Sequence, residues 1–223
     1  MELNKDINFS IIDMDSWERK EYFEHYYKNV RCTYSITTNV DITEIYNQTK
    51  EHHLRLYPTL IWWMANAVNH FEFLRFNYDE YENVGYYDTV NPSFTYMPPQ
   101  SDKFNVLWCK YNQCFQDFYL NCVEIMDNFD KSRMFPINDM PKNCFDISSI
   151  PWIEFTSFNL NVYTDGTHLA PIFTTGKLIK DTGKIKIPVS LQVHHSVCDG
   201  YHVGQCFTYL QKLSDEANKW LRC

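Results

Sequence analysis

The segment that decides our interpretation reads Lys184-Ile-Lys-Ile-Pro-Val-Ser-Leu-Gln-Val-His-His-Ser-Val-Cys-Asp-Gly200. Polar and apolar residues alternate along it, which is the pattern of a half-buried β-strand. Because successive strand side chains point to opposite faces, the odd-numbered residues from Ile185 to Val193 share one face. Continuing that alternation places His195 with them and His194 on the other face. The sequence therefore predicts that the second histidine points inward.

An inward histidine in an apolar setting suits a general base, because burial disfavours the charged ring and leaves Nε2 able to accept a proton. Such a histidine is more often an ordinary core residue, and the pair His52-His53 occurs without any surrounding motif. Asp199-Gly200 before a helix is also common capping and turn chemistry. The combination is more informative: a long strand, two histidines, an aspartate four residues after His195, a glycine and then a helix.

Helix and strand patterns alternate on both sides of this segment. The sequence predicts helices over residues 17–27, 59–71, 113–129 and 203–213. It predicts strands over residues 31–40, 152–162, 172–180 and 184–197, with shorter ones near 74–79, 94–97 and 105–109. No repeat or Gly/Ser linker interrupts the pattern, so we expect one α/β domain spanning residues 1–223, in which helices cover a sheet.

Composition excludes several classes of partner. The chain has 223 residues, with 20 Lys and Arg against 28 Asp and Glu, a formal charge of −8. A nucleic-acid-binding protein needs a basic surface, so DNA and RNA are not expected ligands. The longest apolar stretch, Leu60–Val68, is too short to cross a bilayer, and Met1–Ile7 lacks the features of a signal peptide. We expect a cytoplasmic protein without membrane contact.

The eight cysteines are scattered and form no C-x-x-C pair. Without an export signal they do not indicate a disulfide framework, and most are expected to be small buried residues. No histidine and cysteine spacing matches a structural zinc site, so we predict no metal.

The motif His194-His-Ser-Val-Cys-Asp-Gly-Tyr-His-Val-Gly204 resembles the signature of the type A chloramphenicol acetyltransferases. Other segments match that family in order and spacing: Trp17-Glu-Arg19 with Phe23 and Tyr26, Tyr57-Pro58, Phe135-Pro136, Ser148-Ser-Ile-Pro-Trp152, Ser157-Phe-Asn-Leu-Asn-Val162 and Ala170-Pro-Ile-Phe-Thr174. The resemblance covers about residues 1–215. The His-x-x-x-Asp-Gly core is less specific, since acyltransferase subunits of 2-oxo acid dehydrogenase complexes and peptide-synthetase condensation domains share it.

The resemblance implies a single-domain, two-layer α/β sandwich with a mixed sheet, and an enzyme that acetylates the 3-hydroxyl of chloramphenicol and confers antibiotic resistance. His195 would take the proton of that hydroxyl, which attacks the thioester of acetyl-CoA directly, without an acyl-enzyme. General-base catalysis of this kind contributes ~10²–10⁴-fold. Ser148, expected just before a strand opening at Pro151-Trp152, would stabilise the oxyanion.

The resemblance also implies supporting and binding residues. Asp199 would form a buried ion pair with Arg19 and so fix the loop that holds His195. The substrate pocket should be aromatic and aliphatic. The family positions that line it correspond to Tyr26, Tyr34, Phe104, Phe135, Leu160, Val162, Ile172 and Thr174. Taken alone, each of these residues is typical of an ordinary core.

Coenzyme A requires a local basic contact on this acidic protein. Arg55 precedes a predicted helix start, where free amides favour anions, and it matches a basic family position near the 3′-phosphate. Lys177 is a weaker candidate, since a solvated hairpin lysine is the simpler interpretation. Tyr57 and Trp152 are the remaining cofactor-binding residues implied. The resemblance finally implies a homotrimer with active sites between subunits, which suits the 17% aromatic content.

Three alternatives remain open from the sequence. The first is an acyltransferase of the same architecture that acts on another hydroxylated acceptor or on a dihydrolipoyl group. The second is a noncatalytic protein that binds the antibiotic. The third is a metal site formed by His194, His195 and Asp199, which strand alternation opposes because adjacent histidines point apart.

Overall fold

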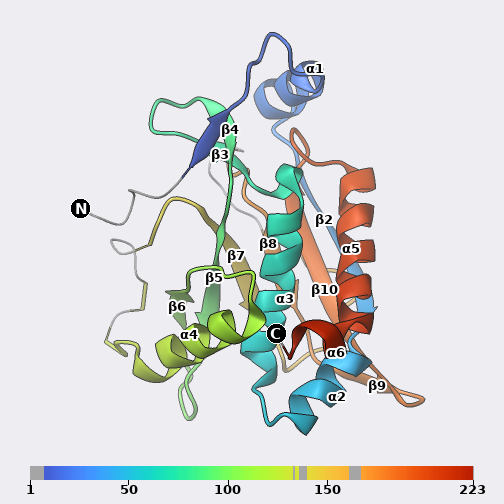
Figure 1. Cartoon of the computed structure of the whole chain (residues 1–223). Coiled ribbons are helices and arrows are strands. Elements are labelled where there is room, and N and C mark those ends of the chain that lie inside the picture. Colours follow the sequence, from blue (N-terminus) through green and yellow to red (C-terminus); the bar gives the residue numbers. More distant parts are fainter. Residues whose placement is uncertain (1–7, 133, 136–139, 161–166, 223) are drawn as a thin grey trace.

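The computed structural model describes residues 8–132, 134, 135, 140–160 and 167–222 of the chain (Figure 1). Its elements in chain order are β1 (Phe9–Ile11), α1 (Lys20–Glu24), the π-helix η1 (His25–Asn29), β2 (Thr33–Asp41), α2 (Thr43–Glu51), α3 (Leu56–His70), the 3-10 helix η2 (Glu72–Leu74), β3 (Phe76–Tyr78), β4 (Val84–Tyr87), β5 (Asn91–Tyr96), β6 (Asn105–Trp108), α4 (Phe115–Asn128), β7 (Cys144–Ser149), β8 (Ile172–Thr175), β9 (Ile179–Asp181), β10 (Lys184–His194), α5 (Gly200–Asp215) and α6 (Ala217–Trp220).

A mixed sheet forms the centre of the molecule. Its strands lie in the order β2-β10-β8-β7-β5-β6, and β9 pairs with the start of β10. Strand β10 is antiparallel to both β2 and β8, whereas β7 is parallel to β8 and β5. A separate three-stranded sheet has the order β1-β4-β3. Because β10 is paired on both sides, it gives firm support to the residues that follow it.

The two faces of the central sheet differ in chemistry. Val189, Leu191 and Val193 of β10 are buried in the core with helices α3 and α5, which lie in front of the sheet in Figure 1. Ser190 and Gln192 point to the opposite face. There they bond to the segment of residues 158–160 rather than to a helix. Helices therefore cover one face of the sheet, which makes the fold a two-layer α/β structure.

Helix α3 is the central helix of the core. Its residues are apolar on nearly every side, as expected for a helix that packs against both the sheet and other helices. The indole Nε1 of Trp63 donates to Leu210 O of α5 at 2.9 Å, so the ring is buried without losing its hydrogen bond. Pro58 lies in the first turn, as predicted, where its missing N–H costs no helical bond.

The predicted α/β class with a mixed sheet is confirmed, and the helices expected over residues 59–71, 113–129 and 203–213 are present as α3, α4 and α5. The strand predicted over residues 172–180 is divided into β8 and β9. Strands β1, β4 and β7 were not predicted.

The strand predicted over residues 152–162 is wrong for the part that the structure describes, residues 152–160. Backbone groups there bond to side chains of the sheet instead of to a neighbouring strand. Phe158 N donates to Thr37 Oγ1 at 3.3 Å, and Leu160 N donates to Gln192 Oε1 at 2.8 Å. The segment thus lies across the face that none of the described helices covers.

The helix predicted over residues 17–27 is shorter and changes geometry. Helix α1 is followed directly by the π-helix η1, and the Ser16 hydroxyl donates to Asp13 instead of capping α1. A π-helix has a wider turn than an α-helix. Here it carries Tyr26 and Tyr27 to the end of β10.

Candidate active site

Strand β10 ends at His194, before the second histidine. His194 is fully buried, with its Nδ1 2.7 Å from Ser196 Oγ and its ring centroid 5.7 Å from that of Tyr27. His195 follows in a turn and is only partly buried. The structure thus buries His194 more completely than His195, whereas the sequence predicted that His195 points inward. Alternation between faces applies up to His194 and cannot place His195, which follows the strand.

The His195 imidazole lies against two tyrosines. The Tyr26 ring stacks on it, with centroids 3.9 Å apart and an angle of 4° between planes, and the Tyr34 ring is tilted at 5.1 Å. His195 N donates to Cys32 O at 2.9 Å, and Tyr34 Oη donates to Cys198 O at 3.4 Å. Nδ1 of His195 is buried and makes no hydrogen bond with any described residue. Nε2 is not among the buried polar atoms that have no partner. Nε2 is thus the nitrogen available to a substrate.

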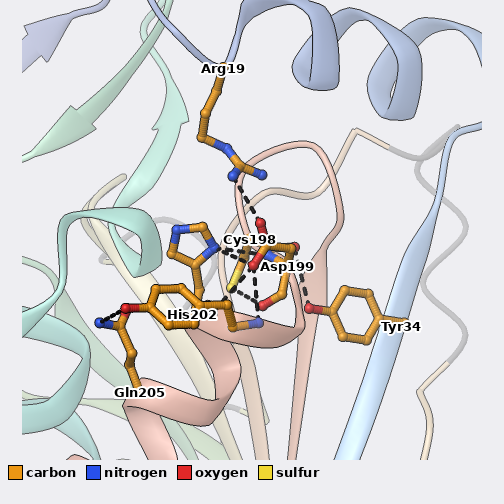
Figure 2. Close-up of polar contacts among 7 residues, drawn as sticks. Arg19, Tyr34, Cys198, Asp199, His202 and Gln205 are labelled. Atoms are coloured by element: carbon orange, nitrogen blue, oxygen red, sulfur yellow. Dashed lines mark hydrogen bonds and ion pairs between the residues drawn. The ribbon is translucent and has the colours of Figure 1, made fainter.

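Asp199 joins the loop after His195 to the N-terminal segment (Figure 2). Its Oδ2 accepts a hydrogen bond from Arg19 Nη1 at 3.0 Å. Its Oδ1 accepts from the backbone of Tyr201 at 3.1 Å and of His202 at 3.4 Å, which caps helix α5. The His202 Nδ1 atom lies 2.8 Å from Oδ1 and 3.2 Å from the backbone nitrogen of Asp199. Residues 199 and 202 therefore form a capping box at the start of α5.

Charge and burial set the pKa values in this network. Burial alone would raise the pKa of the Asp199 carboxyl, but Arg19 and His202 outweigh burial and hold that pKa below its ordinary value. Burial lowers the pKa of His202, and the Asp199 charge opposes this only in part. Burial also raises the pKa of Tyr34, which stays a neutral donor. The Arg19–Asp199 ion pair implied by the resemblance is present, although its side chains are 23% and 33% exposed rather than buried.

The sequence predicted that Ser148 precedes a strand that begins at Pro151-Trp152. In the structure, Ser148 instead lies within strand β7. It pairs with Thr174 on β8, which pairs with Ser190 on β10. Two strand spacings separate Ser148 from β10, and the chain continues along the sheet from Ser190 to His195. Together these steps place Ser148 roughly 20 Å from His195. Within one chain, the Ser148 hydroxyl is too distant to contact a group bound at His195.

The residues predicted to line the substrate pocket lie in different places. Tyr26 and Tyr34 are at His195. Ile172 and Thr174 are buried on β8, next to the strand that carries Ser148. Among the described residues, Tyr34 therefore shares a face of the sheet with Val193, whereas Thr174 shares the opposite face with Ser190.

The other predicted pocket residues are more exposed. Phe104 and Phe135 form an edge-to-face pair with centroids 6.3 Å apart, and their residues are 45% and 51% exposed. Leu160 is 44% exposed and bonds through its backbone to Gln192. Val162 lies outside the described residues.

A cleft of about 660 Å³ near the start of α3 brings together three of the four residues expected to contact coenzyme A. Tyr57, Trp152 and Lys177 all line it. The Tyr57 hydroxyl donates to Thr95 O at 2.6 Å, which holds that ring in the cleft wall. Trp152 is 62% exposed. The cleft therefore offers an aromatic wall and a cation.

Arg55, the fourth residue, lines an adjoining pocket of about 420 Å³ that shares Tyr57 with the cleft. Its guanidinium is already paired: Nη1 and Nη2 donate to the two carboxylate oxygens of Asp127 at 2.8 and 3.0 Å. The residue that the resemblance places near the 3′-phosphate therefore already has an anionic partner, and its contact with coenzyme A stays a prediction.

Within residues 8–222 as described, no group of three or more His, Cys, Asp or Glu side chains gathers to hold a metal. The alternative site of His194, His195 and Asp199 is not assembled, since His194 bonds to Ser196 and Asp199 bonds to Arg19. The described cysteines are free thiols. None of the helices in the described part of the chain has the length and apolar character needed to span a bilayer.

Two polar residues at these sites, His202 and Asp127, were not predicted from the sequence. His202 occupies the position at which capping boxes usually carry Glu or Gln, so its spacing from Asp199 was a usable signal. Asp127 gave no signal, because it meets Arg55 only through the packing of α4 beside the start of α3.

Solved structures define the fold. A chloramphenicol acetyltransferase superposes with a TM-score of 0.84 at 22% identity, covering 92% of this chain and 99% of that one. A dihydrolipoamide acetyltransferase of Azotobacter vinelandii superposes with a TM-score of 0.66 at 18% identity, covering 90% of this chain and 88% of that one. The fold is therefore that of the coenzyme A-dependent acyltransferases.

Sequence similarity defines the family. The family model for chloramphenicol acetyltransferase matches residues 7–211. The chloramphenicol acetyltransferase of Clostridium butyricum is 44% identical over 216 residues, covering 96% of this chain and 99% of that protein. That of Bacillus pumilus is 44% identical over 215 residues, covering 96% of each. The chain belongs to the chloramphenicol acetyltransferase family, and the resemblance inferred from its motifs is confirmed.

Proposed function

We propose that this protein transfers the acetyl group of acetyl-CoA to the 3-hydroxyl of chloramphenicol and so confers resistance to that antibiotic. The observation that carries the proposal is the His195 imidazole, held against Tyr26 and Tyr34 with Nε2 accessible, in a chain of this family. Acetyl-CoA is a co-substrate and the proposed chemistry uses no metal. One catalytic domain acting in the cytoplasm is part of the same proposal.

His195 is the general base in this proposal. Nε2 accepts the hydroxyl proton while the substrate oxygen bonds to the thioester carbonyl carbon. The carbon–sulfur bond then breaks, and the imidazolium returns its proton to the leaving thiolate, so no acyl-enzyme forms. The oxyanion of the intermediate accepts a hydrogen bond from the Ser148 hydroxyl.

We propose further that each reaction centre forms between two copies of the chain, in the homotrimer that the family resemblance implies. The separation of roughly 20 Å between His195 and Ser148 in one chain supports this arrangement. The sheet supports it as well, because no helix of the described residues covers its face with Ser190, Gln192 and Thr174, and β2 is an edge strand. A second copy would bring its own Ser148 to the first copy's His195.

The cleft of Tyr57, Trp152 and Lys177 is the proposed binding site for the coenzyme. Its volume of about 660 Å³ and its aromatic wall suit the pantetheine arm and the adenine ring. The adjoining pocket with Arg55 suits the 3′-phosphate. Asp199 and Arg19 are positioning residues that fix the loop carrying His195.

The test is an assay of the purified protein with acetyl-CoA and either chloramphenicol or dihydrolipoamide as the acceptor. Chromatography then separates and quantifies the acetylated products. We expect 3-acetylchloramphenicol as the main product and its loss in His195→Ala. Faster acetylation of dihydrolipoamide would support the alternative acyltransferase. Binding of chloramphenicol without any product would support the noncatalytic binder.

A further inference from the structure

An ion pair occupies the pocket that adjoins the coenzyme cleft. The guanidinium of Arg55 and the carboxylate of Asp127 are joined by two parallel hydrogen bonds of 2.8 and 3.0 Å. This fork geometry is the one by which arginine recognises both carboxylates and phosphates. The side chains are 50% and 47% exposed, so a dissolved anion can reach the pair. A carboxylate therefore already fills the anion-binding fork of Arg55.

The backbone around Arg55 is fixed independently of Asp127. Arg55 N donates to Tyr119 Oη at 2.8 Å, and Thr59 Oγ1 donates to Arg55 O at 2.9 Å. Only the guanidinium depends on Asp127. Loss of that carboxylate should therefore leave Arg55 in place with its donors free.

Asp127 is poorly placed for its own helix. It lies in the last turn of α4, which ends at Asn128, and the negative end of the helix dipole disfavours a carboxylate there. Its contact with Arg55 offsets this cost. Helix stability alone therefore gives no reason for an acidic residue at this position.

The same pocket holds a second cation. Lys131 lines it and makes no hydrogen bond or ion pair with any residue that the structure describes. With Arg55, Asp127 and Lys131 ionised, the pocket carries one net positive charge. Without the charge of Asp127 it would carry two.

We propose that Asp127 is a specificity-determining residue that competes with the 3′-phosphate of coenzyme A for the guanidinium of Arg55. This inference rests on the proposed function, which places the coenzyme in the adjoining cleft. The incoming phosphate exchanges with the carboxylate at Nη1 and Nη2, while Lys131 remains available to either anion. The 3′-phosphate thus adds less affinity than it would at an unpaired arginine.

The experiment compares KM for acetyl-CoA and for acetyl-dephospho-CoA, which lacks the 3′-phosphate, in the parent protein and in Asp127→Asn. We expect Asp127→Asn to lower KM for acetyl-CoA about twofold to fivefold, as for an exposed ion pair, and to leave KM for acetyl-dephospho-CoA unchanged. An unchanged ratio of the two KM values, or a rise in KM for acetyl-CoA, would overturn the inference.

Two controls separate the possible causes. Glu124→Gln removes one charge from the exposed face of the same helix, at a residue outside the pocket, and should alter the KM ratio less than Asp127→Asn. In an Arg55→Met background Asp127→Asn should no longer lower the KM for acetyl-CoA. Equal effects of Glu124→Gln and Asp127→Asn would show that only the overall charge matters, and would also overturn the inference.

A third variant tests the cleft itself. Trp152→Ala should raise KM for both cofactors, because both share the part of the coenzyme that lies in the cleft. If Trp152→Ala changes neither value, the placement of the coenzyme fails. If it raises both while Asp127→Asn leaves their ratio unchanged, the cleft stands and only the role of Asp127 fails.

Discussion

The loop after β10 and the strand that carries Ser148 differ in how completely one chain builds them. Asp199 is bonded to Arg19, to His202 and to the start of α5, and the neighbouring imidazole of His195 is stacked on Tyr26. Ser148, in contrast, is held by its strand β7 alone: its hydroxyl makes no hydrogen bond with a described residue, and it lies roughly 20 Å away. The comparison supports the proposal that one chain positions His195 by its own contacts, while the Ser148 hydroxyl that acts with it belongs to another copy.

The largest expected effect is the loss of the base. His195→Ala should lower kcat/KM for chloramphenicol by ~10²–10⁴-fold, because the variant lacks the imidazole that accepts the hydroxyl proton. Steady-state assays at saturating acetyl-CoA measure this. His52→Ala, which removes an exposed histidine outside the site, should keep the parent rate. Equal activity of His195→Ala and the parent would end the assignment of the base.

The loss of Ser148 should be next in size. Ser148→Ala should lower kcat by about 10²-fold or more, with little change in the folded state, because one oxyanion donor is removed. The decisive measurement mixes the two inactive variants. When His195→Ala and Ser148→Ala chains are refolded together, about a quarter of the sites in a closed ring should pair an intact His195 with an intact Ser148. If activity does not return, the two groups do not act across a shared interface.

The next prediction concerns the ion pair between Arg19 and Asp199, whose loss should affect both the stability of the fold and the rate. Arg19→Met should lower the free energy of unfolding by about 1–2 kcal/mol, between the values for exposed and for buried pairs. It should also lower kcat, since the loop of His195 loses its tie to the N-terminal segment. Urea unfolding and kinetics check both effects. The control is Lys20→Met, which removes the neighbouring exposed pair with Asp15 and should change neither the free energy of unfolding nor kcat. If Lys20→Met lowered both as much as Arg19→Met does, Arg19 would have no special role.

The smallest effect concerns pH. Burial holds the pKa of His202 below its ordinary value of 6.5, so the unfolded chain takes up a proton there before the folded protein does. The neutral His202 therefore contributes to the free energy of unfolding above pH 6.5, and this contribution is lost as the pH falls through the pKa of His202 in the folded protein. We expect His202→Gln, which retains a capping acceptor, to show a weaker loss of unfolding free energy between pH 7.5 and 5.5. Urea unfolding at both pH values measures this, and an identical loss in parent and variant would contradict it.

Much of the fold was predictable because its signals are local. The three long helices follow from apolar spacing, and β10 follows from the alternation that starts at Lys184. Strand β7 was not predicted, because the strand has only six residues and ends with two serines. Residues 152–160 were assigned wrongly, because their apolar pattern arises from contact with the sheet face and not from pairing.

The site was predictable in part for the same reason. His195, Asp199 and Arg19 were identified through a motif, and the structure brings Asp199 and Arg19 into contact. Alternation could not place the His195 side chain, since the strand ends one residue before His195 and alternation ends with it. The pairing of Arg55 with Asp127 could not be predicted, because it depends on how α4 packs beside the start of α3.

By itself the sequence determined the family, the strand-to-helix motif and the identity of the candidate base, because these depend on residue types at short spacing along the chain. Only the tertiary structure decided that Tyr26 stacks on His195, that Arg55 is already paired and that Ser148 lies on a distant strand. Those facts depend on distances between segments far apart in the chain. Such distances are fixed by packing and strand order, which spacing along the chain does not encode.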